Sequence, residues 1–144
     1  MPGESRSLES LTREDSIDLL SSAVVGRVVF TLSALPAVVP VAFGVLDDTL
    51  VLRTSEGTRL AAAADGGVLA FEADEIDPVA RTGWSVVVTG IAELVTDPMR
   101  RSRIHAMVEP FVSGENDVCI SLALSVVTGR RVVSTIRESV PAGG

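Results

Sequence analysis

The feature that most limits the fold of this chain is that its strand-like segments are apolar on both faces, as in VVPVAFGVL (residues 38–46) and WSVVVTGI (residues 84–91). Short strands joined by tight turns predict a mainly β fold, a small antiparallel barrel with flanking helices. A barrel of this size has only one interior to fill, so its apolar outer face needs a cover. Helices can cover part of that face, and we expect a second copy of the chain, in an isologous dimer, to cover the rest.

Turn and cap signals place the other elements along the chain. Thr12 and Asp15 predict the start of an amphipathic helix, and Asp97-Pro98 predicts the start of another. Gly90, inside a long strand, predicts a bulge or a corner of the barrel. Pro40 cannot donate to a strand ladder and therefore predicts an edge or irregular position. The expected division is a flexible tail over residues 1–10, one domain over residues 11–137 and a second flexible tail over residues 138–144.

Composition excludes several classes of function. The chain has 144 residues, 47% of them hydrophobic, and a net charge of −7, which argues against nucleic acid as a partner. No segment approaches the roughly 20 apolar residues that span a bilayer, so we expect no membrane and a cytoplasmic location. The single cysteine, Cys119, excludes an internal disulfide and predicts no cysteine-based metal site, only a buried thiol. The single histidine, His105, is expected to be a surface or packing residue.

Residues 51–67, VLRTSEGTRLAAAADGG, read as a strand that ends in a polar turn and enters an alanine-rich helix. Ser55 or Thr58 can cap that helix. Arg53 and Arg59, the hydroxyl groups and the first backbone N–H groups of the helix together predict an anion site for a phosphate. The alternative is that Arg53 is an exposed strand residue and Arg59 a solvated helix residue.

Five segments together resemble one family. VGRVVF, PAVVPVAFGV, LVLRTSEGTRLAAAADGGVLAFEAD, IDPVARTGWSVVVTGIAELVTDP and VVTGRRV follow the order and spacing of pyridoxamine 5′-phosphate oxidase-related flavin-binding split-barrel proteins. The resemblance runs from about Leu11 to Val133 and is strongest to the short single-domain branch that includes nitroimidazole-resistance-like proteins. It implies an antiparallel split barrel of Greek-key type and a homodimer with FMN in the cleft between subunits. It also implies an FMN-dependent oxidoreductase that transfers a hydride between the flavin and a small-molecule substrate.

The resemblance also implies which residues bind the cofactor. Arg53 and Thr54 line the ribityl–phosphate channel, and Ser55, Thr58 and Arg59 hold the phosphate. Val39, Pro40 and Val41 border the flavin ring, and Trp84 and Ser85 approach from the strand that begins GWSV. For Trp84 the alternative is packing in the core or interface. Arg130 and Arg131 match a family motif, and a solvated strand end is the alternative for one of them.

No set of catalytic residues stands out, and the acidic residues Glu72, Asp74, Glu75 and Asp77 are expected in a solvated loop. This absence fits a flavoprotein, because the cofactor carries the redox chemistry. Two alternatives stay open: a deazaflavin-dependent reductase of the same fold, and a non-catalytic protein that binds flavin or haem.

Overall fold

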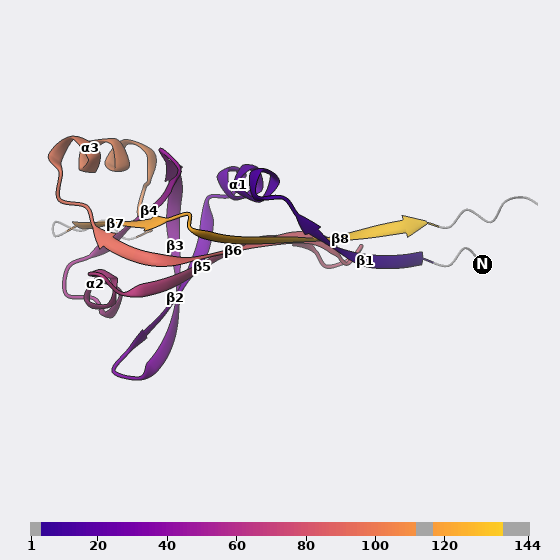
Figure 1. The fold of residues 1–144 in the computed structure, drawn as a ribbon, viewed down its shortest axis with the longest axis horizontal. Helices are drawn as coiled ribbons and strands as arrows, with labels where there is room; N and C mark the ends of the chain where they lie inside the picture. Colours follow the sequence, from indigo (N-terminus) through magenta and orange to yellow (C-terminus); the bar gives the residue numbers. More distant parts are fainter. Residues whose placement is uncertain (1–3, 112–116, 137–144) are drawn as a thin grey trace, which may run out of the picture.

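The computed structural model describes residues 4–111 and 117–136. Within these residues all strand pairs are antiparallel, and three short helices connect or cover the strands (Figure 1). In chain order the elements are β1 (Glu4–Leu11), α1 (Arg13–Ser22), β2 (Val25–Leu32), β3 (Leu35–Leu46), β4 (Thr49–Ser55), α2 (Arg59–Ala64), β5 (Val68–Asp77), β6 (Thr82–Leu94), α3 (Pro98–Met107), β7 (Asp117–Ala123) and β8 (Val126–Ile136).

Six of the strands close into a barrel in the order β6-β5-β2-β3-β4-β7 and back to β6. Strand β6 changes partner partway: it pairs with β8 up to Thr89 and with β7 from Ala92. Gly90 lies at this change, where an added Cβ would be 2.8 Å from the carbonyl oxygen of Ala123. The close approach of two backbones requires glycine, which confirms the predicted corner. The mainly β antiparallel barrel is confirmed as well.

The barrel interior is filled by aliphatic and aromatic side chains from every barrel strand. Phe71 of β5 is fully buried and packs against Phe43 of β3, with 4.5 Å between ring centroids. Leu60 and Ala64 place one face of α2 in the same cluster. Each fully buried large apolar side chain contributes about 1.5–3 kcal/mol, so this interior is the main source of stability.

The helices begin where the sequence predicts. Thr12 caps α1 by accepting a hydrogen bond from the N–H of Asp15 at 3.1 Å, and Asp97 caps α3 in the same way. Helix α1 can approach β8 closely because Gly129 has no side chain; an added Cβ would lie 2.1 Å from Ser16 Oγ. In Figure 1, α1 and α3 lie on one side of the sheet and α2 on the other. Among the described helices, none has the length and apolar character to span a bilayer.

Two expectations about the chain ends and loops need correction. Residues 1–10 were expected as a flexible tail, but Glu4–Leu11 forms β1, which pairs with β8 along its whole length. Strands β1 and β8 lie far apart in the sequence, so no local pattern reveals that the edge of β8 is open for β1 to pair with. The expected acidic loop is also mostly strand, since β5 continues to Asp77 and β6 begins at Thr82. The expected tail over residues 138–144 lies outside the described residues.

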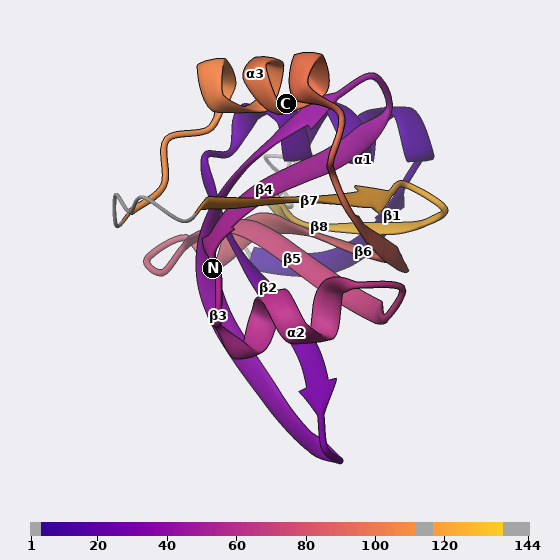
Figure 2. The same cartoon turned by 90° about the vertical axis from the view of Figure 1, so that its left-hand side faces the viewer.

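One face of the sheet formed by β2, β5, β6 and β8 carries apolar side chains that are exposed in the single chain. Strand pairing aligns them: Val29 lies opposite Ala70, Ala70 opposite Thr89, and Thr89 opposite Val126. Figure 2, turned by 90° from Figure 1, shows that the β2–β3 hairpin extends past α2, so α2 does not cover the far end of the hairpin. The exposed apolar residues of this sheet face include Val25, Val29, Val68, Ile76, Val87, Ile91 and Val126.

Candidate functional site

A cavity with both apolar and polar lining residues lies between the open edge of β3 and the ends of β4 and β7. Its volume is about 180 Å³, and β3, β4 and the segment after α3 contribute most of its wall. Six of the residues predicted to bind a cofactor line it: Val39, Pro40, Val41, Arg53, Thr54 and Ser55. The structure therefore brings the predicted ring-side and channel residues together around one cavity.

Arg53 is the charged residue that the sequence singles out in this cavity, and it is firmly held. Its Nε donates to Asp117 Oδ2 at 2.8 Å, and its Nη1 donates to the carbonyl oxygen of Val108 at 2.7 Å. The side chains of Arg53 and Asp117 are only 13% and 12% exposed. Both charges are thus largely removed from water and satisfied by each other, which fixes the guanidinium in the cavity wall. Arg53 is not the exposed strand residue that the alternative prediction describes.

The hydroxyl groups at the end of β4 form a local network around the start of α2. Thr58 is the helix cap: its Oγ1 accepts from the N–H of Ala61 at 3.1 Å and donates to the carbonyl oxygen of Ser55 at 2.9 Å. The hydroxyl of Thr54 lies 3.2 Å from that of Thr58. These contacts fix the turn that places Thr54 and Ser55 at the cavity. Thr58 itself does not line the cavity.

Pro40 lies on the part of β3 that has a strand neighbour on one side only, among the described residues. The N–H of Phe43 donates toward β2, to Val24 at 3.3 Å. Because the backbone groups of successive strand residues alternate between the two edges, Ala42 and Pro40 direct theirs to the open edge. A proline is tolerated there because no strand needs its missing N–H. The predicted edge position is confirmed, and it borders the cavity.

Arg59 does not join Arg53. It is the first residue of α2, and its side chain is exposed and absent from the cavity wall. The reason is the orientation of α2, whose buried face carries Leu60 and Ala64. The expected meeting of two guanidinium groups is therefore not found in the single chain.

Trp84 and Ser85 line a different cavity, of about 250 Å³, on the β6–β8 part of the sheet. Arg130 of β8 pairs with Ser85 and lines the same cavity, whereas Arg131 pairs with Trp84 and does not line it. Trp84 is half-buried and also packs against the main core, so the packing prediction holds for part of its surface. Within one chain these residues do not reach the cavity around Arg53.

Asp117 and Phe111 also line the first cavity, together with Ala42 and Pro110, and the sequence prediction missed all four. Asp117 is also within 2.7 Å of His105 Nε2, so this carboxylate contacts a cation and an imidazole at once. The role of Asp117 could not be predicted from neighbouring residues, because its partners come from strand β4 and helix α3. A carboxylate placed directly before an apolar strand was the only available signal.

A second group of charges lies on the exposed sheet face. Arg27 Nη1 contacts Glu72 Oε1 at 3.3 Å and Asp74 Oδ2 at 3.4 Å. Burial raises the pKa of Glu72 to about 7, helped by a hydrogen bond and charge repulsion from Asp74, while Arg27 opposes the shift. The acidic residues were predicted to be in a solvated loop. Glu72 and Asp74 instead lie two residues apart on β5, so their side chains share one face.

Cys119 is fully buried in β7, as the sequence predicts. Burial raises the pKa of its thiol, and the charge of Asp117 adds to this, while Arg101 and Arg53 oppose it.

An antiparallel six-stranded barrel, opened at β3 beside a cavity, defines the class of single-domain split-barrel proteins. The chain belongs to the pyridoxamine 5′-phosphate oxidase-related split-barrel family, because residues 12–133 match the family model described as Pyridoxamine 5′-phosphate oxidase. The resemblance seen in the sequence is thereby confirmed.

Individual relatives agree with this assignment. The uncharacterized protein Rv0080 of Mycobacterium tuberculosis is 41% identical over 141 residues, covering 94% of this chain and 93% of that protein. A solved FAD binding protein from Mycobacterium smegmatis is 33% identical, with a TM-score of 0.72, over 85% of this chain and 96% of that one. A protein from Bacteroides thetaiotaomicron assigned to 5-nitroimidazole antibiotic resistance has a TM-score of 0.72 at 15% identity, over 92% of this chain and 93% of that one. This last similarity shows the fold alone.

Proposed function

We propose that this chain binds a flavin nucleotide in the cavity around Arg53 and acts, as a homodimer, as a flavin-dependent oxidoreductase on a small molecule. The observation that carries the proposal is the cavity wall itself, where the open edge of β3 meets Arg53, Thr54 and Ser55. The name of the M. smegmatis relative, an FAD binding protein at 33% identity, supports the same cofactor class.

The residues present fit the phosphate-bearing tail of such a cofactor. A guanidinium has five N–H donors, and the contacts described above use two of those of Arg53, so donors remain for an anion. The hydroxyl groups of Thr54 and Ser55 add neutral donors nearby. Arg59 stays a proposed phosphate ligand for a tail that extends past Ser55 to the start of α2. Since FMN and FAD share the ribityl phosphate, both are candidates, with FMN the one implied by the family resemblance.

The negative charge of Asp117 opposes the binding of a phosphate at this site. It shares the cavity wall with Arg53 and is its ion-pair partner, so it competes with any incoming phosphate for the same guanidinium. A charge-assisted hydrogen bond contributes about 1.5–3 kcal/mol. We expect Arg53 to favour phosphate binding, and Asp117 to oppose it, by free energies of this size.

In this proposal, a second copy of the chain completes the site. The two cavities, of about 180 and 250 Å³, are each smaller than the roughly 300–1,000 Å³ typical of cofactor sites. The exposed apolar sheet face of β2, β5, β6 and β8 provides a surface for an isologous dimer. In such a dimer, Trp84, Ser85 and Arg130 of one protomer are proposed to face the partner's cavity around Arg53.

The bound flavin would supply the hydride chemistry, and the chain would supply position and exclusion of water. Among the described residues that line the cavity, the titratable side chains are Arg53 and Asp117, already engaged with each other. Because each is engaged with the other, we propose that Arg53 binds the cofactor and that neither group transfers protons. The proposed substrate is a small molecule held between the protomers.

Titration of the purified protein with FMN, FAD and a deazaflavin, side by side, tests the cofactor. Quenching of flavin fluorescence and bleaching of the bound flavin by NAD(P)H are expected for the oxidoreductase. Binding without bleaching by any nicotinamide supports a non-catalytic flavin binder, and uptake of the deazaflavin alone supports the deazaflavin-dependent reductase. Failure to bind all three refutes the proposed cofactor class.

Three variants test the site. Arg53→Ala should weaken flavin binding by about 1.5–3 kcal/mol, whereas Asp117→Asn, which keeps the shape and removes the competing charge, should strengthen it. The control is Arg13→Ala, which removes an exposed arginine of α1 from outside the cavity. Equal affinities in all three variants would remove the cavity around Arg53 from the proposal. Circular dichroism of each variant shows whether the fold is intact.

A further inference from the structure

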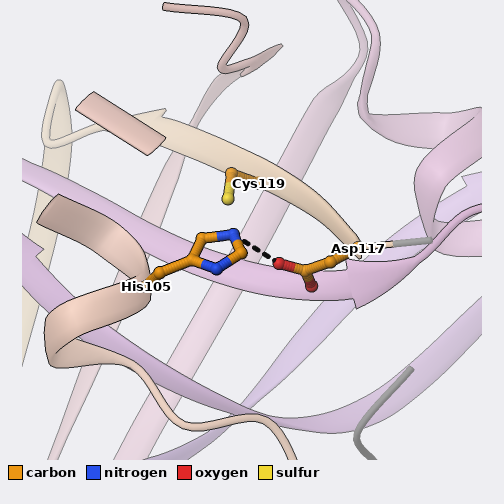
Figure 3. Close-up of side chains that lie close together, drawn as sticks. All are labelled: His105, Asp117 and Cys119. Atoms are coloured by element: carbon orange, nitrogen blue, oxygen red, sulfur yellow. Dashed lines mark ion pairs between the residues drawn. The ribbon is translucent and has the colours of Figure 1, made fainter. Parts of the chain in front are cut away.

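Three side chains of different chemistry converge behind the cavity wall, where α3 crosses β7. They are His105 of α3 and Asp117 and Cys119 of β7, and their ligand atoms all lie within 4.8 Å of one another (Figure 3). His105 Nε2 and Asp117 Oδ2 lie 2.7 Å apart. The sequence predicted no metal site, because a single cysteine argues against a cysteine-based site and no cluster of metal ligands stands out in the chain. The tertiary structure brings together three potential metal ligands that lie apart in the sequence.

The fold positions all three donors. Asp117 and Cys119 are two residues apart on a strand, so their side chains lie on the same face of β7. Arg101 holds α3 over that face, since its Nη2 donates to the carbonyl oxygen of Asp117 at 3.0 Å and its Nη1 to that of Val95 at 3.3 Å. Arg53 binds the residue after α3 through the carbonyl oxygen of Val108. The donors are thus fixed from both ends of the helix.

The arrangement differs from that of a nucleophile with a histidine base. In a cysteine–histidine–aspartate relay, the thiol and the carboxylate contact opposite ring nitrogens. Here Asp117 contacts Nε2, and Figure 3 shows the sulfur of Cys119 on the side of the ring where that same nitrogen lies. This geometry, in which three donor atoms converge on one point, fits a metal centre better than it fits a proton relay.

Donor chemistry selects the ion. Thiolate, imidazole and carboxylate are the three ligand types that bind Zn²⁺, whereas Mg²⁺ and Ca²⁺ take oxygen ligands. Three protein donors leave a fourth tetrahedral position for water. The side chain of His105 is 40% exposed, which gives an ion a route to the otherwise buried thiol.

The surrounding charges permit a cation. Metal binding deprotonates a cysteine ligand, so with an ion bound the thiolate of Cys119 and the carboxylate of Asp117 would offset the two guanidinium groups of Arg53 and Arg101. Arg53 contacts Oδ2 of Asp117, and a hydrogen bond from a neighbouring group to a ligating carboxylate is a usual feature of metal sites. We propose that His105, Asp117 and Cys119 form a zinc site that ties α3 to β7.

Cobalt provides the direct test, because Co²⁺ bound to a thiolate in tetrahedral geometry has characteristic visible bands and a sulfur-to-metal charge-transfer band. The chain has one cysteine and one histidine, so in tag-free protein any cobalt–thiolate signal reports Cys119. We expect one Co²⁺ per chain, with a charge-transfer band that Zn²⁺ abolishes by displacement. The absence of that band in folded protein with excess Co²⁺ would overturn the proposal.

Variants separate this site from adventitious binding to surface carboxylates. His105→Ala and Cys119→Ser should each weaken Zn²⁺ binding by at least about tenfold, since even loss of an outer-shell partner costs that much. Ser102→Ala, an exposed position of α3 without a metal donor, is the matched control and should bind as the wild type does. Because His105 is partly exposed, its variant tests the site even where the buried Cys119→Ser fails to fold. Unchanged Zn²⁺ affinity in folded His105→Ala refutes the site.

Discussion

The raised pKa of Glu72 predicts a pH dependence of stability with a defined sign. Burial and the neighbouring Asp74 raise this pKa from its ordinary value of 4.5 to about 7, so the folded state favours the protonated carboxyl more than the unfolded state does. Below about pH 4.5 Glu72 is protonated in both states and causes no loss. As the pH rises through the folded pKa, ionisation costs the folded state free energy, so stability is lost toward pH 7 and above.

The magnitude follows from the same values. Raising a pKa from 4.5 to about 7 corresponds to at most about 3.4 kcal/mol, at about 1.36 kcal/mol per pH unit. The Glu72 side chain is 29% exposed and faces Arg27, so solvent screening reduces the expected effect to about 1–2 kcal/mol.

Urea denaturation at several values between pH 5 and pH 8 measures this effect. The free energy of unfolding of Glu72→Gln, relative to that of the wild type, should rise by about 1–2 kcal/mol across that range. Glu75→Gln, on the opposite face of β5, controls for the loss of a carboxylate as such. Parallel pH profiles for the wild type and Glu72→Gln would refute the reasoning.

Three further predictions concern packing, capping and assembly. Gly26→Ala should lower the free energy of unfolding by about 1–3 kcal/mol, because the new Cβ would lie 2.1 Å from Cζ of the buried Phe71; an unchanged urea midpoint would contradict this. Thr58→Ala should cost about 0.5–2 kcal/mol by removing the cap of α2, measured in the same assay against wild type. Dilution of the flavin complex should release flavin together with the monomer, and analytical ultracentrifugation with flavin absorbance detects a monomer that keeps its flavin, which would argue against a shared cleft.

Much of the fold could be predicted from the sequence because its signals are local. The strand over Thr49–Ser55 and the cap at Thr12 depend on neighbours within a few residues, and the structure has both. The corner at Gly90 and the edge position of Pro40 follow from what glycine and proline permit in a backbone. Strand β1 was missed because its eight residues pair only with β8, at the other end of the chain.

In the candidate site, too, local features could be predicted from the sequence and contacts between distant residues could not. By itself, the sequence determined that Arg53, Thr54 and Ser55 end a strand that leads into a helix, since the alternation of strand residues and the turn chemistry are encoded in adjacent positions. Only the tertiary structure decided that Arg53 pairs with Asp117, which is 64 residues away, that Arg59 points to solvent, and that His105 meets Cys119. Those outcomes depend on strand register and on the placement of α3, and no short stretch of sequence specifies either.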